Sequence, residues 1–159
     1  MGGGLMERVL VLHGPNLNLL GEREPEIYGN TTYRKLNQQI KKWAKGLDFS
    51  VIVFQSNHEG ALIDRIQRER RNVCGVLINP GAFTHYSYAL RDAIASVSLP
   101  TVEVHLSDIS KRESFRRHSV IKAVCFKQIS GHGPESYLIG MQYLRRKLNN
   151  VDRKPAKKN

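Results

Sequence analysis

The chain has 159 residues, of which 40% are hydrophobic, and a formal net charge of +11. This length predicts one domain with a sizeable hydrophobic core. No apolar run approaches the roughly 20 residues that a transmembrane helix needs. The first residues show no charged region followed by an apolar one, so no signal peptide is expected. A cytoplasmic protein is the default expectation.

The positive charge is concentrated near the C-terminus. Residues 145–159 contain seven basic residues and one acidic residue. A basic chain invites a nucleic-acid interpretation, but a short charged tail is usually solvated. We therefore expect a single domain over residues 1–149 and a basic, disordered tail over residues 150–159. Salt-sensitive nucleic-acid binding through this tail is kept as a second hypothesis, which deletion of the tail would test.

Five apolar runs rich in Val and Ile do not alternate with polar residues, which predicts strands of a parallel sheet covered on both faces. These runs are Val9–Leu12, Val51–Phe54, Gly75–Ile78, Thr101–Val104 and Ile121–Ile129.

Helical patterns with three- and four-residue steps lie between these runs. They cover residues 33–47, with Thr31 as the expected cap, and then 62–66, 86–97, the polar segment 110–117 and 134–148. Alternating strands and helices predict an α/β fold. With five strands, the expected architecture is a flavodoxin-like three-layer sandwich whose parallel sheet has the order 2-1-3-4-5.

The connection between the first strand and the first helix is unusually long. Such connections usually take about two to six residues, whereas residues 13–28 here include apolar residues and several Gly and Pro residues. Long loops with their own apolar residues are often functional. We interpret this one as a mobile lid that carries Arg23 and Tyr28.

Ligands of open parallel sheets bind beyond the carboxyl ends of the strands. In this sequence, polar residues gather there, at Asn16 and in the segments 55–60, 79–85 and 103–107. His105 ends an apolar strand. It is either a hydrogen-bonded core histidine or a catalytic acid or base.

Other candidates at this edge also have two interpretations. Asn79 precedes a Pro-Gly pair, so its role could be limited to forming a turn. The role of His85 could likewise be limited to capping the third helix. Arg112 and Arg116 lie four residues apart, so they form either a solvated face or a grip for a polar ligand. Asp92 falls outside the apolar stripe of its helix and should point to solvent or to a neighbouring subunit.

The sequence lacks several known signatures. It has no Gly-x-x-x-x-Gly-Lys-Ser/Thr loop and no complete Gly-x-Gly-x-x-Gly after a strand. The first strand is not followed by a Ser/Thr-rich phosphate loop, which disfavours flavin or nucleotide binding, and the histidines lack metal-site spacing. Cys74 and Cys125 are expected to be buried and reduced rather than paired.

Six blocks of the sequence resemble, in order and spacing, the type II 3-dehydroquinate dehydratases. These blocks are residues 14–29, 55–60, 79–85, 89–93, 103–107 and 115–119. The resemblance covers about residues 7–148. It implies a flavodoxin-like fold and a homo-oligomer, a dodecamer built of trimers.

The resemblance also implies a reaction. This is the dehydration of 3-dehydroquinate to 3-dehydroshikimate in the shikimate pathway, by anti elimination through an enolate. No metal, no cofactor and no Schiff base are implied.

Residue roles follow from the matching positions. Tyr28 matches the base, Arg23 the lid arginine beside it, His105 the proton donor, and Asn16 the holder of the water that stabilises the enolate oxygen. The positions matching substrate ligands are Asn79, His85, Leu106, Ser107, Arg116 and, from a neighbouring subunit, Asp92.

These roles are chemically coherent. Free tyrosine has a pKa near 10, and a nearby guanidinium favours the phenolate. Hydroxide leaves poorly, so an acid must protonate it, and an imidazole suits that role. Glu103 is expected to face the other side of the strand from His105, and no role is assigned to it. Asp108, Ser110, Arg65 and Gln67 depart from the residues usual in the family, outside the catalytic set.

Overall fold

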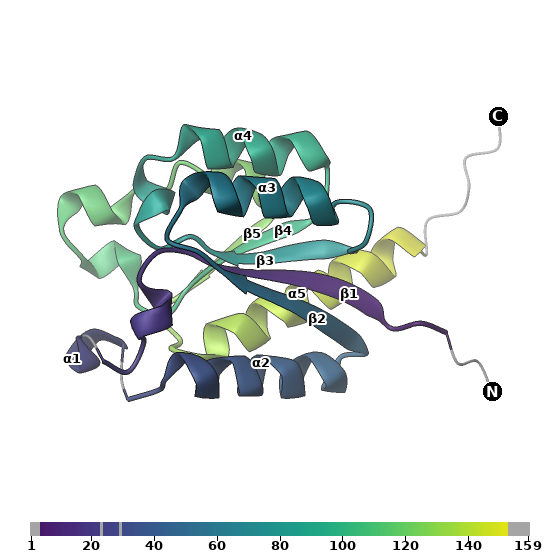
Figure 1. The fold of residues 1–159 in the computed structure, drawn as a ribbon, viewed down its shortest axis with the longest axis horizontal. Helices are drawn as coiled ribbons and strands as arrows, with labels where there is room; N and C mark the ends of the chain where they lie inside the picture. Colours follow the sequence, from purple (N-terminus) through teal and green to yellow (C-terminus); the bar gives the residue numbers. More distant parts are fainter. Residues whose placement is uncertain (1–3, 23, 29, 153–159) are drawn as a thin grey trace.

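The computed structural model describes residues 4–22, 24–28 and 30–152, without the side chains of Tyr28 and Asp152. Five parallel strands form one sheet in the order β2-β1-β3-β4-β5, which confirms the predicted topology (Figure 1). The strands are β1 Glu7–His13, β2 Phe49–Gln55, β3 Gly75–Asn79, β4 Thr101–His105 and β5 Lys127–Ser130. The α-helices are α1 Pro25–Tyr28, α2 Tyr33–Gly46, α3 Glu59–Glu69, α4 Tyr88–Val97 and α5 Glu135–Asp152. Short 3₁₀ turns are η1 Leu17–Leu19, η2 Gly81–His85, η3 Ile109–Lys111, η4 Ser114–Arg117 and η5 Lys122–Val124.

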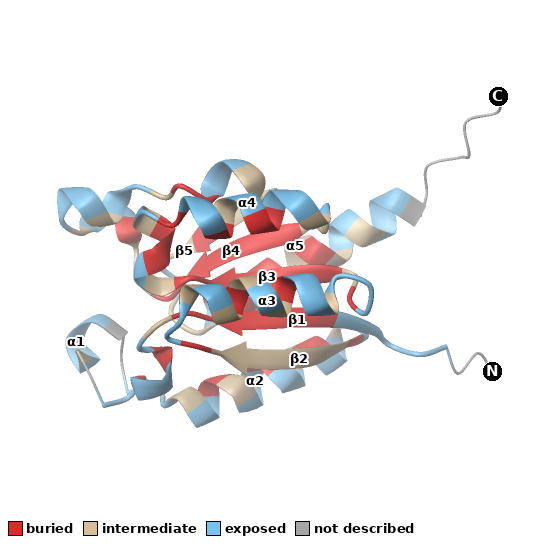
Figure 2. Ribbon diagram, turned by 45° about the horizontal axis from the view of Figure 1, so that its top comes forward, coloured by how far each residue is buried: buried red, intermediate tan, exposed pale blue. Residues whose placement is uncertain are grey.

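Helices cover both faces of the sheet. Helices α3 and α4 lie on one face, and α2 and α5 lie on the other (Figure 1). Successive residues of β1 serve the two faces in turn, since side chains alternate along a strand. Val9 and Val11 belong to the core under α2 and α5, whereas Leu10 and Leu12 belong to the core under α3 and α4. The sheet is therefore the middle layer of three. In Figure 2, β3, β4 and most of β1 are red, β2 and β5 are mostly intermediate, and the first two residues of β1 are exposed.

Helix starts are set by capping side chains, although not always by the predicted ones. The hydroxyl of Thr32, rather than Thr31, accepts a hydrogen bond from the amide of Lys35 at the start of α2. The start of α4 is capped by Ser87, whose hydroxyl accepts from the amide of Leu90, so His85 does not cap it. Each cap satisfies one of the amides that a helix start leaves without a partner.

The fifth predicted strand is too long. Residues 122–124 form the turn η5, and only Lys127–Ser130 pair with β4. Ile121 is fully buried in the core under α3 and α4, so the apolar run before β5 packs under the helices instead of extending the sheet. An apolar run shows that a segment is buried, not which backbone conformation buries it.

The last helix ends later than expected. Helix α5 runs to Asp152, so residues 150–152, assigned from the sequence to the tail, are helical. Residues 153–159 lie outside the described part. Within the described residues, no helix is both long and apolar enough to cross a membrane.

Candidate active site

The main pocket lies at the carboxyl ends of the strands, where the sequence placed the site. Among its lining residues are seven of the predicted site residues: Asn16, Asn79, His85, His105, Leu106, Ser107 and Arg116. Three loops carry them, after β1, after β3 and after β4. The parallel sheet therefore brings together residues that are about 90 positions apart in the chain, because all its strands end at the same edge.

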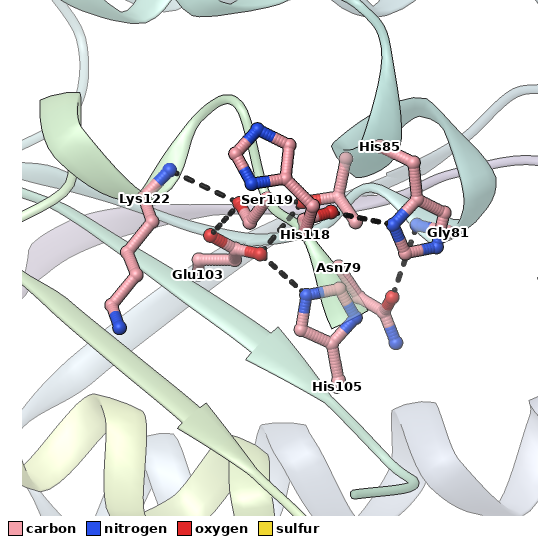
Figure 3. A network of polar contacts seen from close by, with 9 residues as sticks. Asn79, Gly81, His85, Glu103, His105, His118, Ser119 and Lys122 are labelled. Carbon is pink, nitrogen blue, oxygen red and sulfur yellow. Dashed lines mark hydrogen bonds and ion pairs between the residues drawn. The ribbon is translucent and has the colours of Figure 1, made fainter. Parts of the chain in front are cut away.

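His105 is a buried histidine with a carboxylate beneath it. Its Nε2 lies 2.5 Å from Oε2 of Glu103, and the two side chains are 7% and 0% exposed. Figure 3 shows the imidazole between Glu103 and Asn79. With Nε2–H donating to the carboxylate, Nδ1 is left for the pocket that His105 lines.

The sequence interpretation of Glu103 was wrong. Residues two apart in a strand face the same side, and Glu103 and His105 both face the layer of α3 and α4. Because Glu103 and His105 are two residues apart in one strand, the sequence alone could have predicted that Glu103 lies beside His105.

The Glu103 carboxylate is held by two further donors. The Thr84 hydroxyl donates to Oε2 at 2.7 Å. The Ser119 hydroxyl donates to Oε1 at 2.8 Å (Figure 3). Burial works to raise the pKa of Glu103, but the hydrogen bond and charge of His105 and the two hydroxyls outweigh it, so the pKa lies below its usual value. The carboxylate therefore stays ionised and can stabilise a positive charge on His105.

The His85 ring is hydrogen-bonded to the backbone of His118, and its pKa lies below the ordinary value. Its Nδ1–H donates to the carbonyl oxygen of His118 at 2.7 Å. Burial is the largest influence that lowers its pKa, and the nearby His105 and Arg116 add to it. A neutral imidazole with a donating Nδ1 has Nε2 as an acceptor, so His85 is suited to accept a hydrogen bond from a substrate hydroxyl.

The loop after β1 is held against the site by the end of β2. Gln55 Nε2 donates to the carbonyl of Gly14 at 3.2 Å and to Asn18 Oδ1 at 3.3 Å. The Asn57 side chain accepts from the backbone amide of Asn16 at 3.0 Å. Asn16 itself has a φ of 68°, a left-handed conformation that Asn tolerates better than most residues. Its place at the pocket is therefore set by backbone geometry.

Arginines form the opposite rim. Arg112 and Arg116 both line the pocket. The Nε of Arg116 lies 2.9 Å from Oε2 of Glu113, and its guanidinium lies 4.8 Å from the centre of the Phe115 ring. Two guanidinium groups therefore lie at the pocket, and that of Arg116 is paired with Glu113.

Comparisons with known proteins agree with this geometry. The family model Dehydroquinase class II matches residues 7–145. The chain belongs to the class II dehydroquinase family. It is 54% identical, over 88% of its length and 97% of the relative, to the 3-dehydroquinate dehydratase of Caldicellulosiruptor saccharolyticus. It is 57% identical to that of Nostoc sp., over 86% of this chain and 92% of the relative.

A solved structure shows the same fold. The type II dehydroquinase from Butyrivibrio crossotus is 48% identical, with a TM-score of 0.86 over 89% of this chain and 99% of that chain.

The segment that we interpret as a lid is only partly described. Arg23 and the side chain of Tyr28 lie outside the described residues, so their predicted roles stay predictions. The backbone of Tyr28 ends α1, and its neighbour Ile27 lines two surface depressions together with Ser107. Helix α1 therefore lies at the same end of the molecule as the pocket (Figure 1).

Asp92 does not line the pocket of its own subunit. It is exposed on α4, as its helical phase predicted, while Ala93 and Ile94 beside it are buried. Any part that Asp92 plays in catalysis must come from contact with another subunit.

Proposed function

We propose that this chain dehydrates 3-dehydroquinate to 3-dehydroshikimate by anti elimination through an enolate, with Tyr28 as the base and His105 as the acid. The activity is that of the class II dehydroquinase family, which acts in the shikimate pathway. The observation that carries the residue assignment is the pair His105–Glu103 at the mouth of a pocket lined by the expected ligands.

The first step removes a proton beside the ketone. A phenolate at Tyr28, favoured by the Arg23 guanidinium, takes this proton. The electron pair moves to the ketone oxygen, and a water held by Asn16 donates a hydrogen bond to the resulting enolate. Donors aimed at a developing oxyanion usually contribute strongly to catalysis.

The second step expels the hydroxyl. The enolate collapses, its electron pair forms the carbon–carbon double bond, and the carbon–oxygen bond breaks. His105 gives a proton to the departing oxygen, which leaves as water. A protonated His105 is stabilised by Glu103, whose carboxylate remains charged in the buried site. The dyad thus supplies an acid next to a leaving group that could not depart as hydroxide.

We assign substrate binding to residues of the subunit's own pocket and to one residue from a neighbouring subunit. We assign the substrate carboxylate and hydroxyls to Asn79, His85, Arg116 and the pair Leu106–Ser107, all at the pocket. Asp92 is proposed to reach a neighbouring subunit's site, in a dodecamer built of trimers. Its exposure on α4 is compatible with such a contact. Neither a metal nor a cofactor has a role in this scheme.

We also propose a cytoplasmic location. Cys74 and Cys125 are both free and half-buried, as is usual in a reducing compartment.

The experiment is to add 3-dehydroquinate and follow the ultraviolet absorbance of the conjugated enone product. We expect turnover by the natural chain and a severe loss in Tyr28→Phe, which keeps the ring but removes the base. Borohydride added with substrate should not inactivate the enzyme, because no Schiff base forms. Full activity of Tyr28→Phe would reject the assignment of the base.

A further inference from the structure

Two hydroxyl groups from outside strand β4 reach the Glu103 carboxylate that contacts His105. Thr84 belongs to the turn η2, and Ser119 lies between η4 and η5. Their oxygens lie 2.7 Å from Oε2 and 2.8 Å from Oε1 of Glu103, and 2.9 Å from each other. Neither residue lines the pocket, so neither is among the groups assigned to the substrate. Any effect that they have on the reaction is therefore indirect.

Both hydroxyl protons are committed to the carboxylate. Each hydroxyl has one proton, whereas the two hydroxyls and the carboxylate make three mutual contacts. An ionised carboxylate is the strongest acceptor among them, and the lowered pKa of Glu103 keeps it ionised. Thr84 and Ser119 therefore donate to Glu103 rather than to each other.

Backbone contacts fix where these two hydroxyls lie. The amide of Lys122 donates to the Ser119 oxygen at 3.1 Å (Figure 3). The amide of Val120 donates to the carbonyl oxygen of Thr84 at 2.7 Å, which joins the segment that carries Ser119 to the turn η2. Val120 and the following Ile121 are buried in the core under α3 and α4. The two donors are thus held around the carboxylate by contacts of their own.

The position of the Glu103 carboxylate decides how His105 is held. A Glu side chain has several rotatable bonds, so a carboxylate without other partners could turn away from the imidazole. With Ser119 bonded to Oε1 and Thr84 to Oε2, Oε2 stays in contact with Nε2 of His105. That contact orients the ring and stabilises a positive charge on it.

We propose that Ser119 and Thr84 are positioning residues for the second step of the reaction, which hold the Glu103 carboxylate against His105 while the hydroxyl leaves. This inference rests on the proposed function, in which His105 is the acid. Because His105 takes no part in the first step, the two hydroxyls should affect the expulsion of water and not the removal of the proton beside the ketone. A purely structural role would slow both steps alike.

The first test compares Ser119→Ala with Ser110→Ala. Ser110 is a matched control, because its hydroxyl also donates to a carboxylate, that of Asp108 at 2.6 Å, but it is exposed and does not line the pocket. With 3-dehydroquinate in deuterated water, NMR measures deuterium uptake beside the ketone, and ultraviolet absorbance measures product formation. Ser119→Ala should raise the ratio of uptake to product formation roughly three- to tenfold, the effect of one hydrogen bond, because the enolate persists longer. Ser110→Ala should leave this ratio unchanged, and an unchanged ratio in a folded Ser119→Ala protein would overturn the proposal.

Thr84 provides a second pair of variants if Ser119→Ala does not fold. The Thr84 side chain is fully buried. Thr84→Val keeps the shape of the side chain and removes the hydroxyl, whereas Thr84→Ser keeps the hydroxyl and removes a methyl group. We expect Thr84→Val to raise the ratio and Thr84→Ser to leave it close to the natural value. A ratio no higher in Thr84→Val than in Thr84→Ser would show that packing, and not the hydroxyl, matters at this position, and would reject the proposal.

A double-mutant cycle tests whether Ser119 acts through Glu103. In the Glu103→Gln background the charge that the hydroxyls hold is absent, so Ser119→Ala should raise the ratio by a smaller factor than in the natural chain. An equal factor in both backgrounds would show that Ser119 acts independently of Glu103 and would reject the proposal. A natural chain that does not turn over 3-dehydroquinate would instead refute the proposed function.

Discussion

Two buried polar systems lie on opposite faces of the sheet, and they differ in charge. Under α3 and α4, the ionised Glu103 is surrounded by donors and contacts His105. Under α2 and α5, His13 and Tyr137 form a row in which every group is neutral. A charged system can drive proton transfer, because it stabilises one protonation state of its partner. A neutral system can only orient what it touches.

The difference also concerns burial. A buried charge is costly unless it is paired and hydrogen-bonded, and Glu103 has three side-chain partners for its two oxygens. The neutral row avoids this cost because none of its groups carries a charge. The fold thus holds an ionised carboxylate at the pocket and neutral hydrogen-bonded groups in the core on the other face of the sheet.

The largest expected effect is on the charged side. His105→Ala should lower kcat roughly 10²- to 10⁴-fold, the usual contribution of a general acid or base. His132→Ala is the matched control, since His132 is exposed on a turn before α5. Steady-state kinetics with 3-dehydroquinate provide the measurement. A kcat of His105→Ala close to that of the control would contradict the proposed acid.

The next prediction concerns the buried neutral His13 and the pH dependence of the free energy of unfolding. The folded His13 has a pKa of about 4, against 6.5 when exposed. Between these values the unfolded chain binds a proton that the folded chain does not, so the free energy of unfolding falls as the pH drops through this window. The full loss is about 3 kcal/mol, reached near pH 4.

Chemical unfolding between pH 7 and pH 4 measures this loss. His13→Gln should flatten the profile in that window, whereas His132→Gln should not. The lowered pKa of Glu103 acts in the same direction but at lower pH. Its contribution is present above the ordinary carboxyl pKa of 4.5 and is lost as the pH falls through the folded value. A profile of His13→Gln as steep as that of the natural chain would show that His13 is not buried as a neutral group.

Removing only the charge under His105 should have an intermediate effect. Glu103→Gln keeps the shape but loses the carboxylate, and a hydrogen bond to a charged group contributes about 1.5–3 kcal/mol. We expect kcat to fall roughly ten- to a hundredfold, less than in His105→Ala. Glu135→Gln, at the exposed start of α5, should have no effect. If Glu103→Gln retains the natural kcat, the carboxylate is structural.

The smallest effects compare two glycines. A Cβ on Gly14 would lie 2.4 Å from the carbonyl oxygen of Pro80, whereas a Cβ on Gly60 in α3 would have no neighbour within 4 Å. Gly14→Ala should therefore destabilise the protein by about 1–3 kcal/mol and shift the Pro80 backbone, which follows Asn79. Gly60→Ala should stabilise it by about 0.5–1 kcal/mol, because Ala favours the helix. Thermal unfolding distinguishes the two, and equal effects would contradict the close approach at Gly14.

Sequence patterns predicted the sheet order and the edge where the pocket lies, because strand burial and parallel topology follow from composition and alternation. The residue pattern also placed candidates at this edge, and family resemblance supplied their roles; seven of the predicted site residues line the pocket. The patterns could not find the row through His13 and Tyr137. Those two residues are 124 positions apart, and only packing between β1 and α5 brings them together. The fifth strand was overextended for a related reason, since Ile121 is buried by helices and not by strand pairing.

The central claim is that Tyr28 removes the proton beside the ketone and that His105 gives a different proton to the leaving hydroxyl, in separate steps. Deuterium uptake beside the ketone of 3-dehydroquinate, followed by NMR in deuterated water, tests it directly. His105→Ala should still catalyse this exchange above the rate without enzyme, while forming product slowly, and Tyr28→Phe should lose both. Exchange that persists in Tyr28→Phe, or that disappears together with dehydration in a folded His105→Ala protein, would contradict the division of roles.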